Sequence, residues 1–293
     1  MEAASVLDPA QHPELEVLPV PELSMDEIDR YMPEFKRAKR PVVLRGYHAA
    51  DEALRSWSFE RFIDRLPEQT VDLDVGDAMV TEGLTFETVS LHDYLRDLAT
   101  GDDSVGDTRY LQGFNIFSQD PSLYDEIHFP HLSEAAVREV RAGWIGPAGT
   151  VTGYHADIGD NQLSQVVGRK LVKFVSPDQS KRVYRTRKYD PNGVACAVNA
   201  DAWDADTHPL FAETEAMGAV LEPGDSVFIP GGWFHYVRSL DRSISVNHVG
   251  YTARQMAVGK TADQIRRFLH NRGLYGDTCT CHMIVDGERV ARR

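Results

Sequence analysis

Gly153-Tyr154-His155-Ala156-Asp157 places a histidine and a carboxylate two residues apart. In an extended strand, side chains at positions i and i+2 point the same way, so both can reach one small cation. A second histidine would complete a 2-His-1-carboxylate triad, which leaves coordination positions open and suits non-haem Fe(II) oxygen chemistry. The best candidate is His235, which ends the stretch Ile229-Pro230-Gly231-Gly232-Trp233-Phe234-His235.

Composition and charge exclude several classes of protein. With 42% hydrophobic residues among 293, the chain can bury a sizeable core. Its formal net charge of -14 argues against a nucleic-acid partner. No run approaches the roughly 18 apolar residues of a membrane span, and the N-terminus is unlike a signal peptide. The three cysteines do not suggest a disulfide framework, so we expect a cytoplasmic protein. From its charge and hydropathy we expect that it binds neither nucleic acid nor membrane.

The order of predicted elements indicates one mainly β domain. Residues 1–23 predict an extended arm, and a capping box at Ser24 predicts a helix that runs toward Arg40. We expect further helices around 58–66 and 90–99, a strand at 70–75, and a short acidic helix near 133–140. From residue 108, short strands and glycine turns favour a sandwich or barrel. The predicted domain spans 24–272, with a β-core at about 108–250, an N-terminal helical layer, a C-terminal helix at 252–272 and a flexible tail at 273–293.

Lys170 belongs to a strand, 170–175, whose two faces are both largely apolar. It shares a face with Val172 and Phe174, so an inward-facing Lys170 needs an anionic partner or a lowered pKa. If the site binds a dicarboxylate, Lys170 is the cation for the far carboxylate. The alternative is that its ammonium group reaches the surface.

Neutral groups of the right kind accompany this lysine. Tyr110 and Thr152 offer hydroxyls to a carboxylate oxygen, although both residues are also common in strands for other reasons. Asn161 and Asn247 could orient a metal-bound ligand, although isolated asparagines more often occupy turns or the surface. Trp144 is expected in the core.

Two further features favour a structural interpretation. The basic run at residues 181–188 predicts a solvated loop. Cys279-x-Cys281-His282 resembles half of a zinc site, but a second ligand pair is missing from the neighbouring sequence, so we interpret it as part of a flexible tail with free thiols.

Taken in order, the motifs resemble the JmjC-type, cupin-fold 2-oxoglutarate oxygenases. They are most similar to the branch that contains the asparaginyl hydroxylase acting on hypoxia-inducible factor. The segments that carry the resemblance span residues 40 to 250: Arg40 to Gly46, Tyr110-Leu111-Gln112, Thr152-x-x-His155-x-Asp157, Asn161, Lys170, Pro223-Gly224-Asp225, Ile229 to His235, and Asn247.

This resemblance implies a double-stranded β-helix and an Fe(II)-dependent hydroxylase. It implies that O2 and 2-oxoglutarate are consumed, succinate and CO2 are formed, and a C–H bond of a protein side chain or an amino-acid-like substrate is hydroxylated. The implied site residues are His155, Asp157 and His235 for Fe(II); Lys170, Tyr110 and Thr152 for the distal carboxylate of 2-oxoglutarate; Asn161 and Asn247 on the iron side; and Gln112 toward the substrate.

Other functions remain open from the sequence. A 2-oxoglutarate-independent metal cupin (an isomerase, lyase or dioxygenase) would use the same metal ligands without Lys170, and a non-catalytic JmjC-like binding module would not need an intact triad. Two departures from the family pattern matter. Val249 stands where relatives often place an aromatic residue. Only one clear helix follows residue 252, so its apolar stripe either covers the core or forms a weak homodimer.

Overall fold

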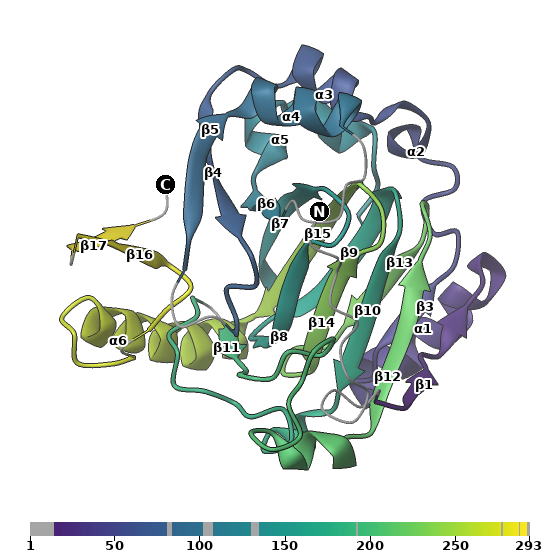
Figure 1. The fold of residues 1–293 in the computed structure, drawn as a ribbon. Coiled ribbons are helices and arrows are strands. Elements are labelled where there is room, and N and C mark those ends of the chain that lie inside the picture. The colour runs from purple at the N-terminus through teal and green to yellow at the C-terminus, as the bar shows by residue number, and fades with distance from the viewer. Residues whose placement is uncertain are drawn as a thin grey trace.

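The computed structural model describes residues 15–80, 84–101, 108–129, 135–191, 193–276, 278–286 and 288–291. Two packed β-sheets lie against one another in the centre of the molecule (Figure 1). The described part of the expected N-terminal arm contributes the short strands β1 (Val17–Pro19) and β2 (Glu22–Leu23) to the sheet edges. Within the described residues, no helix is both long and apolar enough to cross a membrane.

The first sheet has six strands in the order β1-β12-β10-β14-β8-β11. Its strands beyond β1 are β8 (Val151–Asp157), β10 (Lys170–Val175), β11 (Gly193–Ala195), β12 (Ala216–Leu221) and β14 (Phe234–Ser239). The second sheet has nine strands in the order β2-β3-β13-β9-β15-β7-β6-β4-β5. Beyond β2 these are β3 (Val42–Leu44), β4 (Thr70–Val75), β5 (Phe86–Ser90), β6 (Arg109–Phe114), β7 (Ala136–Gly146), β9 (Asp160–Val167), β13 (Ser226–Ile229) and β15 (Ser243–Thr252).

From β7 onward the chain crosses repeatedly between the two sheets, so strands that are consecutive in sequence often face one another across the core. Apolar side chains from both inner faces, among them Leu163, Phe174 and Val227, fill the space between the sheets. This arrangement confirms the predicted mainly β jelly roll. One local prediction is wrong: residues 136–140, expected to end an acidic helix, begin β7, because their backbone pairs with β15.

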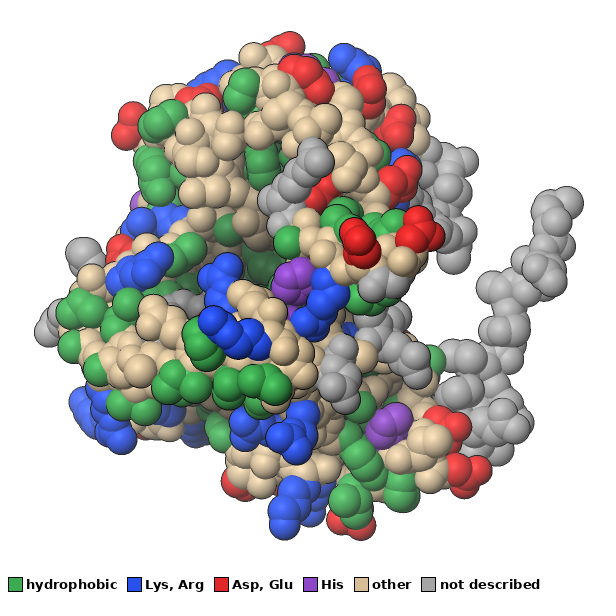
Figure 2. All heavy atoms as spheres, turned by 90° about the vertical axis from the view of Figure 1, so that its left-hand side faces the viewer, with side chains coloured by type: hydrophobic (Ala, Val, Ile, Leu, Met, Phe, Trp, Pro, Cys, Tyr) green, Lys and Arg blue, Asp and Glu red, His purple; other side chains and the backbone are tan. Residues whose placement is uncertain are grey.

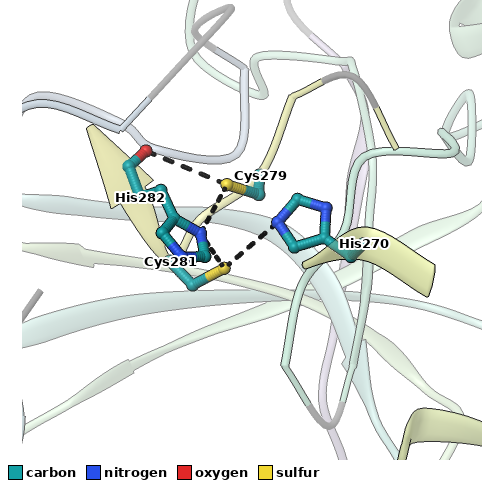
Figure 3. Close-up of side chains that lie close together, drawn as sticks. All are labelled: His270, Cys279, Cys281 and His282. Atoms are coloured by element: carbon teal, nitrogen blue, oxygen red, sulfur yellow. Dashed lines mark hydrogen bonds between the residues drawn. The ribbon is translucent and has the colours of Figure 1, made fainter. Parts of the chain in front are cut away.

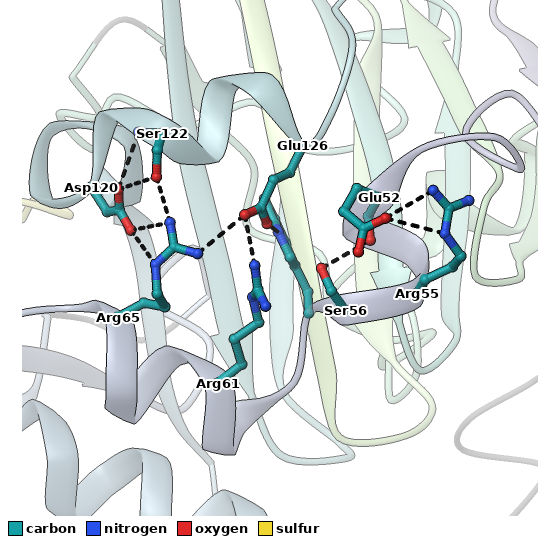
Figure 4. A network of polar contacts seen from close by, with 9 residues as sticks. Glu52, Arg55, Ser56, Arg61, Arg65, Asp120, Ser122 and Glu126 are labelled. Carbon is teal, nitrogen blue, oxygen red and sulfur yellow. Dashed lines mark hydrogen bonds and ion pairs between the residues drawn. The ribbon is translucent and has the colours of Figure 1, made fainter.

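The predicted N-terminal helical layer covers one end of the nine-stranded sheet (Figure 1). It consists of α2 (Glu52–Ser56), α3 (Phe59–Arg65), α4 (Leu91–Thr100), α5 (Ile116–Gln119) and the 3-10 helix η1 (Pro121–Asp125). Figure 4 shows the polar contacts that join α3 to η1 and the residues beside it. Glu126 accepts hydrogen bonds from Arg61 at 2.7 Å and Trp57 at 2.7 Å, while Arg65 pairs with Asp120 at 2.6 Å.

Helix α1 (Met25–Ala38) begins at the predicted capping box, in which the backbone N–H of Ser24 donates to Glu27 at 3.0 Å. This helix lies beside one edge of the sandwich, and the C-terminal helix lies beside the opposite edge (Figure 1). Lys39, the residue after α1, forms an ion pair with Asp160 at 2.8 Å, and its carbonyl oxygen accepts a hydrogen bond from Trp233 at 2.7 Å. The N-terminal helix is thereby attached to the start of β9 and to the turn that precedes β14.

The C-terminal region contains a π-helical segment at Gln255–Lys260 (η4), the helix α6 (Thr261–His270) and a hairpin of β16 (His282–Val285) and β17 (Glu288–Ala291). Ile265 and Phe268 of the expected apolar stripe are 57% and 54% exposed, so within one chain these two side chains do not cover the core. The homodimer stays a prediction.

The turn before β13 generates a prediction about stability. Asp225 is buried and accepts hydrogen bonds from the backbone N–H groups of Gly46 and Glu222, and it pairs with Arg45 at 2.5 Å. Because Asp225→Ala leaves these donors unsatisfied, we expect a loss of roughly 2–4 kcal/mol in the free energy of unfolding. Asp241→Ala, which removes an exposed pair with Arg169, should change stability little. Urea unfolding of both variants measures the difference, and equal midpoints would contradict it.

Candidate metal centre and co-substrate cavity

His155, Asp157 and His235 lie together at the end of the six-stranded sheet. His155 and Asp157 come from β8, and His235 comes from the neighbouring β14, where it pairs directly with His155 in the ladder. The two imidazole centroids are 4.1 Å apart, and His235 Nε2 lies 3.8 Å from Asp157 Oδ2. One ligand atom from each residue lies within 4.8 Å of the others, which is close enough for one ion to contact all three.

The two histidines are oriented by their own backbone neighbours. His155 Nδ1 donates to the carbonyl oxygen of Gly153 at 2.9 Å, and His235 Nδ1 donates to that of Trp233 at 3.1 Å. Each Nε2 is then the unprotonated nitrogen, as a metal ligand must be. Burial, with a smaller contribution from the neighbouring His155, lowers the pKa of His235 to about 4. His235 is therefore neutral at physiological pH.

A β-bulge decides which other side chains share this side of β8. His235 of β14 pairs with His155 of β8. The next pair joins Val237 to Thr152, so a step of two residues along β14 corresponds to a step of three residues along β8. The extra residue reverses the alternation of side chains, because it shifts the strand by one position. Thr152 and His155, which strict alternation would place on opposite faces, consequently line the same cavity.

Asp157 and the turn that precedes His235 are held in register by several hydrogen bonds. Asn161 donates to Asp157 Oδ2 at 3.0 Å, and the N–H of Gly232 donates to the Asp157 carbonyl oxygen at 2.8 Å. The N–H of Gly231 donates to the buried carboxylate of Asp160 at 2.8 Å. A Cβ at Gly231 would lie 2.6 Å from the Ile158 carbonyl oxygen, so this close approach requires glycine.

Lys170 is 1% exposed, which excludes the alternative that it reaches the surface. Its ammonium group donates to the hydroxyl of Tyr110 at 2.8 Å and to that of Ser245 at 2.7 Å. Among the described residues no carboxylate forms an ion pair with it, and burial lowers its pKa to about 7. A cation buried between two hydroxyls has a strong electrostatic preference for an anion beside it.

All the predicted site residues meet in one cavity of about 390 Å³, within the usual size range of small-molecule sites. The metal ligands line it, together with the other residues predicted from the sequence: Tyr110, Gln112, Thr152, Asn161, Lys170 and Asn247. Thr152 donates to Gln112 at 3.3 Å, so these two residues form a pair. The structure brings the set together, and the role of each residue stays a prediction.

Other residues of the cavity were missed or misplaced by the sequence analysis. Ser245, which contacts Lys170, was missed, although strand alternation places it on the same face as Asn247. Trp144 was expected in the core but lines the cavity. Asp190 and Thr280 also line it, although they come from a loop and from the C-terminal tail. Only the structure identifies this pair, because residues 190 and 280 are far apart in the sequence.

Unpaired polar atoms show that the cavity suits polar ligands. Asn247 Oδ1, Asn161 Oδ1 and Trp144 Nε1 are buried without a hydrogen-bond partner, and all three side chains line the cavity. Buried polar atoms normally have partners, so these atoms are expected to contact a bound group. Two imidazoles and one carboxylate, with this polar space beside them, fit Fe(II) and a chelating co-substrate.

A second group of two histidines and a carboxylate, His48, Asp51 and His128, has a different character. Both ring nitrogens of His48 are already engaged, with Asp51 at 2.7 Å and with Ser164 at 2.7 Å. Asp51 also contacts His128 at 2.6 Å. The group is therefore a satisfied hydrogen-bond network that joins the helical layer to β9.

These two groups allow a controlled test of the metal ligands. His235→Ala should abolish stoichiometric Fe(II) binding, because it leaves two of the three protein ligands. His128→Ala should bind iron like the unchanged protein. Anaerobic equilibrium dialysis followed by iron analysis measures both, and normal iron stoichiometry in the His235→Ala protein would show that the assignment is wrong.

Comparison with known proteins agrees with this geometry. The cupin-like domain family matches residues 29–249. Similar proteins include lysine-specific demethylase 8 of Xenopus tropicalis, which is 30% identical over 239 residues, covering 78% of this chain and 52% of that protein. Jumonji C domain-containing protein 5 of Drosophila melanogaster is 27% identical over 238 residues, covering 78% of this chain and 59% of that protein. The tRNA wybutosine-synthesizing protein 5 of Danio rerio is 31% identical over 144 residues, covering 49% of this chain and 43% of that protein.

The chain spans a little over half of the length of the first two relatives. JmjC enzymes use Fe(II), 2-oxoglutarate and O2, which agrees with the donor set and the buried lysine described above. Because the family match extends over most of the chain, the chain belongs to the cupin-like domain family, and its relatives include JmjC domain proteins.

Proposed function

We propose that this chain is a 2-oxoglutarate-dependent hydroxylase that acts on a C–H bond of a protein side chain or an amino-acid-like substrate. One observation carries the proposal. A 2-His-1-carboxylate triad lines the same cavity as a buried lysine that has no carboxylate partner among the described residues. A metal cupin that works without 2-oxoglutarate would have no use for such a lysine, and burying it is costly.

When bound, Fe(II) with 2-oxoglutarate and O2 supplies the oxidising power, and the co-substrate is converted to succinate and CO2. The protein supplies position and charge. Lys170 holds the distal carboxylate of 2-oxoglutarate, and the hydroxyls of Tyr110 and Thr152 complete its binding site. Ser245, the second hydrogen-bond partner of Lys170, orients the ammonium group.

On the iron side, the side chains fix geometry and exclude water. Asn161 orients the metal-binding carboxylate of Asp157 by donating to its Oδ2 atom. Asn247 presents an unpaired carbonyl oxygen to the cavity and is assigned to the ligands that surround the metal. Rigid strands carry all these groups, so their positions are fixed before the substrates bind.

We assign Gln112, Trp144, Val249 and Tyr251, which all line the cavity, to its substrate side. The relatives are named for lysine demethylation and for tRNA modification. Hydroxylation of an N-methyl carbon also begins demethylation, so one oxidation step is compatible with either outcome. The resemblance to the asparaginyl hydroxylase branch favours a stable hydroxylated product on a protein or peptide.

Two experiments test the proposal. Anaerobic addition of Fe(II) and 2-oxoglutarate should produce the metal-to-ligand absorption of a chelated keto acid, and in air the protein should form succinate slowly without substrate. Mass spectrometry of peptides treated with the enzyme should then show products heavier by one oxygen atom, or lighter by a methylene group if demethylation occurs. Absence of both absorption and succinate would contradict the proposal.

The role of Lys170 generates a prediction about 2-oxoglutarate affinity. A lost charge-assisted hydrogen bond is worth roughly 1.5–3 kcal/mol, so Lys170→Met should weaken 2-oxoglutarate binding about ten- to a hundred-fold. Lys173→Met is a matched control, because Lys173 lies on the other face of β10 and pairs with Asp201 at 3.0 Å. Iron binding should change in neither variant. Unchanged 2-oxoglutarate affinity in Lys170→Met would favour the 2-oxoglutarate-independent cupin.

The pKa of Lys170 generates a second prediction. With a pKa of about 7, lowered by burial, Lys170 is mostly neutral above that pH in the free protein. A bound carboxylate favours the charged form and raises the pKa, so binding takes up a proton. Uptake should approach one proton per site at about pH 8 and fade below about pH 6, where Lys170 is already charged. Calorimetry in buffers of different ionisation enthalpy measures it, and Lys170→Met should remove this uptake. Equal uptake by both proteins would assign the proton to another group.

A further inference from the structure

A second group of potential metal ligands lies in the C-terminal region, outside the cavity. It consists of His270, the last residue of α6, and of Cys279, Cys281 and His282, which lead into the hairpin β16–β17. Figure 3 shows the four side chains pointing toward one another. From the sequence, a second ligand pair was expected to be missing; the structure places His270 beside the other three residues as a fourth potential ligand.

Two of the short distances between donor atoms match those of a tetrahedral zinc site, and the third is shorter. Zinc lies about 2.3 Å from thiolate sulfur and about 2.0–2.1 Å from imidazole nitrogen, which places tetrahedral S and N ligands about 3.6 Å apart. Cys279 Sγ lies 3.6 Å from His282 Nδ1, and Cys281 Sγ lies 3.6 Å from His270 Nε2. The remaining short contact, Cys281 Sγ to His282 Nδ1, is 3.1 Å, and all four donor atoms lie within 4.8 Å of one another.

The surroundings of His270 present the correct nitrogen. This side chain is fully buried, and its Nδ1 donates to the carbonyl oxygen of Tyr275 at 2.9 Å. Its Nε2 is then unprotonated and points toward the sulfur atoms, which is the usual arrangement of a histidine ligand with a backbone acceptor behind it. Arg289 lies 3.1 Å from the same Nε2, so a metal ion has to displace this contact. The Arg289 guanidinium also donates to the His270 carbonyl oxygen at 2.9 Å, and this second bond can remain.

The ligand group is attached to the wall of the active-site cavity. The N–H of Tyr189 donates to the carbonyl oxygen of Thr278, and the N–H of Thr280 donates to that of Tyr189, both at 3.0 Å. The hydroxyl of Thr280 donates to Asp190 at 2.5 Å. Thr280 stands between the two cysteines in the sequence, and both Thr280 and Asp190 line the cavity that contains the triad.

We propose that His270, Cys279, Cys281 and His282 bind one structural Zn²⁺, which fixes the C-terminal hairpin and holds Thr280 in the wall of the active-site cavity. Two thiolates and two imidazoles form a closed, soft donor set, which suits zinc and leaves no position for a substrate. Because two thiolates balance the charge of the ion, the site is neutral and can be partly buried at little electrostatic cost. The site is chemically distinct from the oxygen- and nitrogen-rich iron site.

The first experiment separates the two metal sites. The His155→Ala/His235→Ala protein, expressed in zinc-supplemented medium, should retain one zinc ion per chain and bind no iron. Inductively coupled plasma mass spectrometry measures both metals. Cys279→Ser/Cys281→Ser should lose the zinc and still bind iron. Cys196→Ala is the matched control, because Cys196 is a buried thiol outside the cluster, and it should retain zinc. Failure of the proposed oxygenase function would leave these zinc results unchanged.

Two further measurements keep the proposal testable if the double variant does not fold. Cobalt bound to the unchanged protein should give the thiolate-to-metal and tetrahedral absorption bands expected of a Cys2His2 site. Removal of zinc by a strong chelator should expose the tail, so that trypsin cleaves after Arg272 and Arg289 many times faster. The proposal is overturned if the triad-deficient protein contains no zinc, if it holds iron at this site instead, or if the cysteine variant retains full zinc.

Discussion

The antiparallel pairing of β8 with β14 is the constraint on which the active site depends. It places His235 opposite His155, and its bulge turns Thr152 into the same cavity. A slip of one residue would send His235 to the other face of the sheet and destroy the triad. Hydrogen bonds outside the ladder oppose such a slip: Gly232 is tied to the Asp157 backbone, and Gly231 to Asp160, which also pairs with Lys39. The N-terminal helix therefore supports the register of a site that it does not contact.

The buried Lys170 lowers the stability of the folded protein. Its charged form is desolvated, and within the described part of the chain it is compensated by the hydroxyls of Tyr110 and Ser245, so the folded protein holds a group whose ionisation is disfavoured. An apolar side chain at this position would pack against Val172 and Phe174 without that cost. The lysine makes physical sense if a bound anion restores the missing interaction. The unpaired atoms of Asn161 and Asn247 in the same cavity follow the same reasoning.

The sequence predicted the parts of this protein that depend on local spacing. The His-x-Asp pair, the apolar faces around Lys170 and the capping box at Ser24 each act within a few residues. The structure confirms the jelly roll and gathers the predicted residues in one cavity. Features that arise between distant strands were not predictable. The bulge opposite Val237 depends on the partner strand, and the charged start of β7 was interpreted as a helix because its pairing with β15 is invisible locally.

The C-terminal ligand group was also not predictable from local spacing, because its fourth member comes from the end of a helix and not from the cysteine motif. A two-stranded hairpin such as β16–β17 is marginally stable by itself in water. It is also poorly covered here: Ile284, Val285 and Val290 are all exposed, so apolar burial adds little. Figure 2 shows the face that carries this hairpin and α6, where Lys and Arg side chains gather around a hollow.

Hydrogen bonds to Tyr189 and Asp190 position the tail but compete with water. A closed metal site would supply the missing free energy. The unfolded chain offers no preformed site, so the metal binds the folded chain more tightly and stabilises it. Removing that stabilisation would first free Thr280 and Asp190, and would thereby alter the cavity wall while the triad on β8 and β14 stayed intact.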